Sequence, residues 1–74
     1  MKYSRDEKFI KEFGINLQKL RKAQGVTQEE LSYRTELFLS QIGRIERGEI
    51  NTSITMVNKI AQALEISPKE LFDF

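Results

Sequence analysis

The same helix-start signal occurs three times in this chain of 74 residues. A serine or threonine is followed three residues later by a glutamate, so that the hydroxyl caps an early helix amide and the carboxylate reaches back to the capping residue. The signals begin at Ser4, Thr27 and Ser67, and Pro68 follows the last at the first helical position, where a missing amide costs nothing. The chain is therefore expected to be divided into short helices.

Apolar residues recur at spacings of three and four between these signals, which is the period of an amphipathic helix. No segment keeps the period-two alternation of a half-buried strand. We therefore expect an all-α domain of five helices, which begin near Ser4, Thr27, Leu39, Ser53 and Ser67. The buried stripe of the first helix is predicted to be Phe9, Phe13, Leu17 and Leu20. That of the fourth is predicted to be Ile54, Val57, Ile60, Ala61 and Leu64.

Gly14 interrupts the pattern of the first helix. A glycine inside a helix costs up to about 1 kcal/mol relative to alanine. Residues 1–13 could therefore form a separate arm or an N-terminal extension of that helix. In either case residues 1–74 are expected to be a single domain, near the lower size limit for a self-sufficient core.

Composition argues against several classes of site. The chain has no cysteine for a disulfide or thiolate, and no histidine, the commonest general base and neutral metal ligand. The 11 acidic residues form no convincing acid–base motif, and no phosphate-binding loop is present. We therefore expect no enzyme, no metal, no cofactor and no small-molecule ligand.

Charge and hydropathy limit the partners in the same way. The formal net charge is +1, from 12 basic and 11 acidic residues, so any contact with nucleic acid must come from the arrangement of charges. No apolar run is long enough for a signal peptide or for the roughly 20 residues of a membrane span. The sequence therefore predicts a cytoplasmic protein with no membrane partner.

The second and third predicted helices are about four residues apart, which is helix-turn-helix spacing. The stretch TQEELSYRTELFLSQIGRIERGEINTSITMVNKIAQALEISPKELF resembles the Cro/C1-type helix-turn-helix family, and the likeness covers about residues 17–72. TQEEL, RIERG and SPKELF occur at the family's distances. In length the chain is similar to single-domain bacterial regulators, including the controller proteins of restriction–modification systems. The resemblance implies a five-helix, lambda-repressor-like DNA-binding domain.

The turn between these two helices departs from the family's pattern. The family often has glycine where this chain has Glu36, and serine or threonine where it has Phe38. A non-glycine residue in a left-handed turn costs about 1 kcal/mol or more, which leaves open that the turn is opened differently here. Phe38 lies on the apolar side of a helical wheel, and we expect it to staple the turn to the core.

On the same wheel, Ile42 and Ile45 point inward, whereas Ser40, Arg44 and Arg47 point outward. A helix docked in a major groove uses its N-terminal outer side chains for base edges. The predicted base-contacting residues, which match the family's positions, are Leu39, Ser40, Gln41 and Arg44. Arginine can hold guanine O6 and N7 together. Two alternatives stay open. The arginines could form a solvated helix face that contacts no DNA, and Leu39 could pack against the protein and not against a thymine methyl.

Four residues are predicted to contact DNA phosphates, namely Gln28, Arg47, Asn51 and Thr52. For Gln28 the resemblance implies this contact and a brace on the recognition helix, and helix N-terminal amides favour the same anion. The alternative is a surface glutamine. The resemblance further implies a salt bridge between Arg21 and Glu46. The alternative is that the two residues are independent surface charges.

A single unit of this kind reads only a few base pairs, and family members commonly bind palindromic sites as twofold dimers. The candidate dimer interface is Met56, Ile66, Leu71, Phe72 and Phe74. Intramolecular burial of Leu71 or Phe72 is the alternative.

The sequence thus predicts a sequence-specific DNA-binding transcription regulator that places residues 39–47 in the major groove of double-stranded DNA and acts as a homodimer on a palindromic operator. The alternative is a protein-interaction module of the same fold, antitoxin-like or adaptor. Repression and activation are not distinguished, nor are restriction, phage, plasmid and housekeeping systems.

Overall fold

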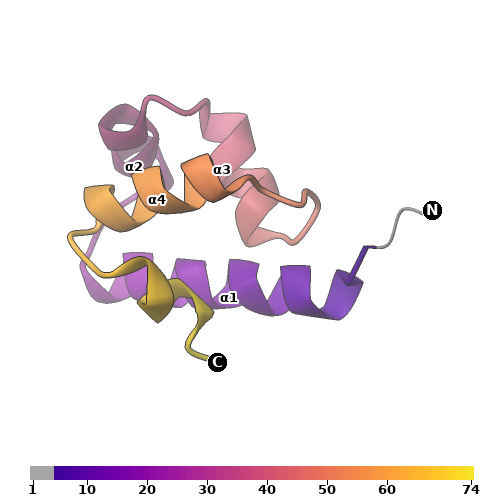
Figure 1. Cartoon of the computed structure of the whole chain (residues 1–74). Helices are drawn as coiled ribbons and strands as arrows, with labels where there is room; N and C mark the ends of the chain where they lie inside the picture. Colours follow the sequence, from indigo (N-terminus) through magenta and orange to yellow (C-terminus); the bar gives the residue numbers. More distant parts are fainter. Residues whose placement is uncertain (1–4) are drawn as a thin grey trace.

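The computed structural model describes residues 5–74, and these contain four α-helices, one short 3₁₀ helix and no strand. The elements are α1 (Glu7–Ala23), α2 (Gln28–Thr35), α3 (Leu39–Glu46), α4 (Ile54–Ala63) and the 3₁₀ helix η1 (Pro68–Phe72). Helix α1 lies along one side of the molecule, and the three shorter α-helices lie together across from it (Figure 1). The all-α prediction is confirmed, except that the fifth helix is a 3₁₀ turn. No helix among the described residues is long and apolar enough to cross a membrane.

Of the five predicted helix starts, those near Thr27, Leu39, Ser53 and Ser67 are correct and the one near Ser4 is wrong. The hydroxyls of Thr27 and Ser53 cap α2 and α4 by accepting the amides of Glu30 and Met56, at 3.0 and 3.1 Å. Helix α1, however, is capped by Asp6, whose carboxylate accepts the amide of the residue three positions later. The predicted start of this helix near Ser4 is wrong, because α1 begins at Glu7. Ser4 itself lies outside the described residues.

The core forms where the inward stripes of all five elements meet. Its fully buried side chains are Leu17, Leu31, Ile42, Ile45, Ile60, Leu64 and Leu71. Two predicted stripe positions are wrong, since Phe9 is 45% and Ile54 is 89% exposed. Ile54 is the first residue of α4, and its side chain lines an open cavity and not the closed core. Ile10, the neighbour of Phe9, is the buried residue on that turn of α1.

Gly14 lies where the backbones of α1 and α3 touch. A Cβ atom at this position would stand 2.4 Å from the carbonyl oxygen of Ile45 and 2.5 Å from that of Glu46. Glycine therefore permits an approach between the helices that any side chain would prevent. Helix α1 continues through this residue without a break, so its first turns, from Glu7 onward, do not form a separate arm.

The turn between α2 and α3 keeps the left-handed geometry despite its sequence. Glu36 has φ 62° and ψ 17°, the conformation that glycine would adopt without strain. The expectation that the turn is opened differently is therefore wrong. Hydrogen bonds hold it closed, since the Ser32 hydroxyl donates to the Leu37 carbonyl and the Leu37 amide donates to the Thr35 hydroxyl.

Phe38 does not staple this turn to the core. Its side chain is 77% exposed, and Leu37, at 9%, takes the inward position instead. Phe38 precedes α3 and has an extended backbone, with φ −65° and ψ 145°. A helical wheel does not apply to such a residue, because successive side chains of an extended chain point to opposite sides.

Candidate nucleic-acid interface

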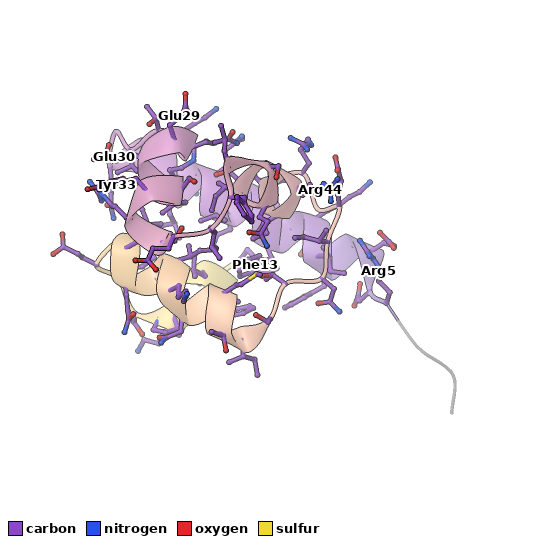
Figure 2. All side chains as sticks on the ribbon, turned by 90° about the horizontal axis from the view of Figure 1, so that it is seen from above. Arg5, Phe13, Glu29, Glu30, Tyr33 and Arg44 are labelled. Atoms are coloured by element: carbon purple, nitrogen blue, oxygen red, sulfur yellow. The ribbon has the colours of Figure 1, made fainter. Side chains whose placement is uncertain are left out.

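Helix α3 presents one face to the core and the other to solvent, as predicted. Ile42 and Ile45 are buried, whereas Ser40, Arg44 and Arg47 are exposed. Figure 2 shows Arg44 on the outside of the molecule, between the exposed side chains of α2 and Arg5. A guanidinium placed on such a face is free to reach a bidentate acceptor such as a guanine edge.

The start of α3 is capped by the side chain of Gln41, one of the residues predicted to contact bases. The side-chain oxygen of Gln41 accepts the backbone amide of Phe38 at 3.0 Å. This bond fixes the side chain of Gln41 beside the start of the helix and leaves its NH₂ group outside the cap. Gln41 is thus half-buried but still carries donors that suit a base or a phosphate.

The end of α3 is fixed by a buried ion pair. Arg21 donates from Nε to Oε2 of Glu46 at 2.6 Å and from Nη2 to Oε1 at 2.9 Å, and the two side chains are only 7% and 1% exposed. The remaining Nη1 of Arg21 donates to the carbonyl of Val26. The predicted pairing of these residues is therefore present, and it joins α1 to the end of α3 with the geometry of a bidentate bridge.

Two glutamines complete the surroundings of Glu46. Gln28 and Gln18 donate their side-chain amides to Oε1 at 2.9 and 3.2 Å. Burial tends to raise the pKa of Glu46, but the hydrogen bonds from Arg21, Gln28 and Gln18 and the charge of Arg21 outweigh it, so that the pKa lies below its usual value. The carboxylate therefore remains charged at neutral pH and acts as the acceptor at the centre of this network.

Gln28 is also placed to meet a phosphate. It is the first residue of α2, where the amides of the first turn point outward, and one of its own N–H groups is used by Glu46. The second N–H is left for an anion at the same helix end. The brace on α3 that the resemblance implies for Gln28 is thus present in the hydrogen bonding. The phosphate contact remains a prediction.

Arg47 is held by a neighbour that the sequence analysis did not single out. Its Nε lies 2.6 Å from Oε2 of Glu49, and both side chains are at least half exposed. The hydrogen bond from Arg47 lowers the pKa of Glu49, so this carboxylate competes with any phosphate for the arginine. The signal in the sequence was the short spacing between Arg47 and Glu49 across Gly48, whose φ of 72° is positive. Arg5, also missed, donates from Nη2 to the carbonyl of Glu49 at 2.7 Å.

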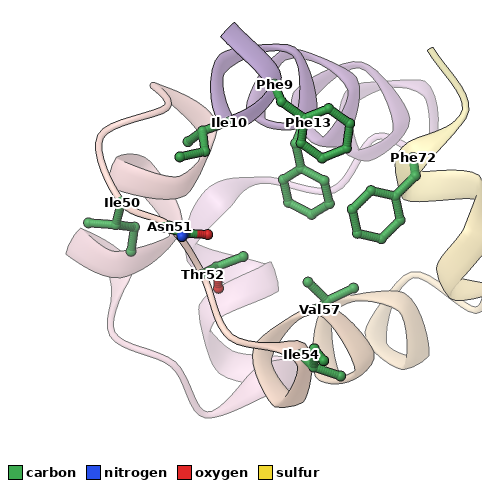
Figure 3. Close-up of a pocket in the computed structure, with 9 residues that line it drawn as sticks. All are labelled: Phe9, Ile10, Phe13, Ile50, Asn51, Thr52, Ile54, Val57 and Phe72. Atoms are coloured by element: carbon green, nitrogen blue, oxygen red, sulfur yellow. The ribbon is translucent and has the colours of Figure 1, made fainter. Parts of the chain in front are cut away.

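The loop before α4 contains the other two residues predicted to contact phosphates, and they differ in how exposed they are. Asn51 is exposed, and its amide is drawn at the edge of the cavity in Figure 3. Thr52 is half-buried and its hydroxyl donates to the sulfur of Met56 at 3.2 Å. Of these two residues, Asn51 therefore has the side chain that is readily available to a phosphate.

The predicted dimer residues do not form one exposed surface. Leu71 is fully buried in its own chain, so its assignment to an interface is wrong, and Met56 and Ile66 are partly buried against the core. Phe72 and Phe74 are 43% and 48% exposed. The exposed apolar side chains therefore belong to the end of the chain and not to the whole C-terminal segment.

These phenylalanines continue into a face that sequence reasoning missed. The ring of Phe9 lies 6.1 Å from that of Phe72 and 5.2 Å from that of Phe74, measured between centroids. Next to them a cavity of about 120 Å³ opens between α1, the loop before α4, α4 and η1, with Ile54 and Val57 on its far side (Figure 3). We call Phe9, Ile54, Phe72 and Phe74 the aromatic face.

Comparison with known proteins places this geometry in a family. The sequence model of the helix-turn-helix family matches residues 17–71. The control protein C.BamHI of Bacillus amyloliquefaciens is 36% identical over 63 residues, which are 84% of this chain and 78% of that protein.

Solved structures agree with the sequence comparison. The restriction–modification controller protein C.AhdI of Aeromonas hydrophila superposes with a TM-score of 0.84 at 43% identity, over 85% of this chain and 96% of that one. The tetramer of the controller protein C.Esp1396I, solved in complex with its natural 35-base-pair operator, gives a TM-score of 0.83 at 29% identity, over 92% of this chain and 90% of that one. The chain belongs to the Cro/C1-type helix-turn-helix family.

Proposed function

We propose that this protein is a sequence-specific DNA-binding transcription regulator that inserts α3 into the major groove. The observation that carries the proposal is the exposed outer face of α3, with Arg44 at its centre, on a helix whose inner face and end are fixed in the core. A reading helix needs this rigidity, because side chains must meet base edges within hydrogen-bond distance.

The roles of the individual residues follow from their positions. Leu39, Ser40, Gln41 and Arg44 would face base edges, since they lie along the N-terminal and outer part of α3. Gln28, Arg47, Asn51 and Thr52 would meet phosphates on either side of the groove, Thr52 through its backbone. Phosphate contacts set the register of the protein on the duplex, and base contacts set the sequence that it reads.

We further propose that the chain binds DNA as a homodimer, on two half-sites about one helical turn apart. The operator complex of the C.Esp1396I tetramer supports assembly of copies on DNA for this chain as well. The aromatic face is the best candidate for contact between copies, because it gathers exposed apolar side chains that water solvates poorly. A transcription regulator of this kind acts in the cytoplasm of bacteria, where the DNA lies.

The dependence of binding on salt tests the DNA-binding proposal. Binding of labelled duplex is measured by fluorescence anisotropy over a range of salt concentrations, and log K should fall linearly with log salt as phosphates release counterions. Arg47→Ala should make the slope shallower by about 1 per subunit. Arg34→Ala is the matched control, because that arginine bonds to the carbonyl of Ala63 and to Glu30, is not among the predicted DNA contacts and should leave the slope unchanged. Binding that does not respond to salt would contradict the proposal.

A protein-interaction module is the second candidate, and the aromatic face together with the net charge of +1 favours it. The two candidates differ in the residues that matter. Phe72→Ser would impair both candidates, since the proposed dimer also uses the aromatic face, but a module that docks a protein partner through that face would be unaffected by Arg44→Ala. A DNA-binding regulator would lose sequence preference with Arg44→Ala.

A further inference from the structure

Two consecutive apolar side chains, Phe38 and Leu39, are exposed at the N-terminal end of α3, by 77% and 45%. We propose that these two side chains form a contact for the C5 methyl groups of pyrimidines in the major groove, and that Phe38 is a specificity-determining residue. This inference rests on the proposed function of α3 as the reading helix. It adds to that function a residue for which the sequence predicted only a role in the core.

The side chain of Phe38 is needed neither to fill the core at the turn nor to cap the start of α3, because neighbouring residues do both. Leu37 fills the inward position in the turn. The amide of Phe38 is satisfied by the side chain of Gln41 at 3.0 Å, and its carbonyl accepts the amides of Gln41 and Ile42 at 2.9 and 3.2 Å. The backbone of Phe38 thus starts the helix, and its ring takes part neither in the cap nor in the core.

The ring of Phe38 does not belong to the aromatic face. Phe9, Ile54, Phe72 and Phe74 belong to the aromatic face, around α1, η1 and the start of α4. Phe38 and Leu39 stand instead at the start of α3, on the same end of the helix from which docked helices contact base edges. They are therefore continuous with the candidate nucleic-acid interface and not with the aromatic face.

The major groove offers an apolar side chain one apolar group, the C5 methyl of thymine. The same methyl group is carried by 5-methylcytosine, so the chemistry that Phe38 and Leu39 recognise has two sources. Leu39 and Arg44 are five residues apart, which corresponds to about 7.5 Å along a helix, or about two base-pair steps of 3.4 Å. The methyl contacts are thus expected within about two base pairs of the guanine held by Arg44.

The test removes the methyl group alone. Bound duplexes are first selected from random DNA, and each thymine of the selected half-site is then replaced by uracil, which pairs identically and lacks only the methyl. Wild type should bind about three- to fivefold more weakly at one or two of these positions, as expected for the loss of one buried methyl. Phe38→Ala should bind the thymine and uracil duplexes equally at the position read by Phe38.

A second set of duplexes identifies the source of the methyl. The thymine–adenine pair at that position is replaced by 5-methylcytosine–guanine or by cytosine–guanine. A wild-type preference for the methylated cytosine that is lost in Phe38→Ala shows that the methyl is read on either ring. Discrimination at thymine alone restricts the contact to thymine, and either result supports the proposal.

Matched variants separate this role from a structural one. Tyr33→Ala removes another aromatic ring, 86% exposed on α2, and should retain the full discrimination between thymine and uracil. Phe38→Ala should melt like wild type, because an exposed ring contributes little to the core. Equal binding of thymine and uracil by wild type at every position would overturn the proposal, as would discrimination that persists in Phe38→Ala. Failure to select any duplex would instead contradict the proposed function itself.

Discussion

Replacing Gly14 by alanine should destabilise the protein, against the usual effect of this change inside a helix. Alanine normally stabilises a helix interior by up to about 1 kcal/mol relative to glycine. At Gly14 the new Cβ would lie 2.4 Å from the Ile45 carbonyl oxygen, and α1 would have to move about 1 Å from α3 to restore an ordinary contact of 3.4 Å.

The magnitude follows from the nature of the obstacle. Overpacking costs about 1–3 kcal/mol, and the upper end applies here because the obstructing atoms are the backbone of Ile45 and Glu46. After the helical gain of alanine, a net loss of about 2 kcal/mol is expected in the free energy of unfolding. The separation would also stretch the 2.6 Å bond between Arg21 and Glu46.

Urea denaturation followed by circular dichroism, at one fixed protein concentration, measures this difference. Gly43→Ala is the matched control, because its Cβ would meet only the flexible guanidinium of Arg47, at 2.8 Å. That variant should gain up to about 1 kcal/mol from helix propensity. If Gly14→Ala were as stable as wild type or more stable, the close contact between α1 and α3 would be refuted.

Further predictions concern the charges and the turn. Arg21→Ala leaves the carboxylate of Glu46 buried and unpaired, so it should cost about 3–5 kcal/mol in urea denaturation, and a loss below about 0.5 kcal/mol would exclude a buried pair. Because the pKa of Glu46 is lower in the folded than in the unfolded state, its contribution is complete above the unfolded pKa of about 4.3 and is lost as the pH falls through the folded pKa. Titration of wild type from pH 6 to pH 2 should show this loss, and a stability that did not fall over that range would contradict it. Glu36→Gly should raise the free energy of unfolding by about 0.5–1 kcal/mol. Glycine adopts the left-handed conformation without strain, and this gain exceeds the loss caused by the greater entropy of glycine in the unfolded chain. A loss of stability in Glu36→Gly would show that the left-handed turn is not strained.

Sequence patterns predicted best those features that depend on regular backbone. The inward and outward faces of α3, the caps at Thr27 and Ser53 and the partnership of Arg21 with Glu46 all follow from helical periodicity, local capping chemistry or the family's motif. Each involves either one helix at a time or a pair of positions that the motif itself connects.

The patterns failed where the backbone is not helical or where packing between distant segments decides. Phe38 was placed on a helical wheel although it precedes the helix in an extended conformation. Glu36 tolerates the left-handed turn because Ser32 and Thr35 close it with hydrogen bonds. The aromatic face joins Phe9 to Phe72 and Phe74 from opposite ends of the chain, and no local pattern connects those ends.

Selection of bound sites from random duplex DNA, with wild type and Arg44→Ala side by side, tests the central claim most directly. Wild type is expected to recover a palindrome with two half-sites about one helical turn apart. Arg44→Ala should recover a site in which one guanine of each half-site is relaxed, at a cost of about 1–3 kcal/mol at that base pair. If wild type enriched no sequence even at low salt, or if Arg44→Ala selected the same site as wild type, α3 would not be the reading helix.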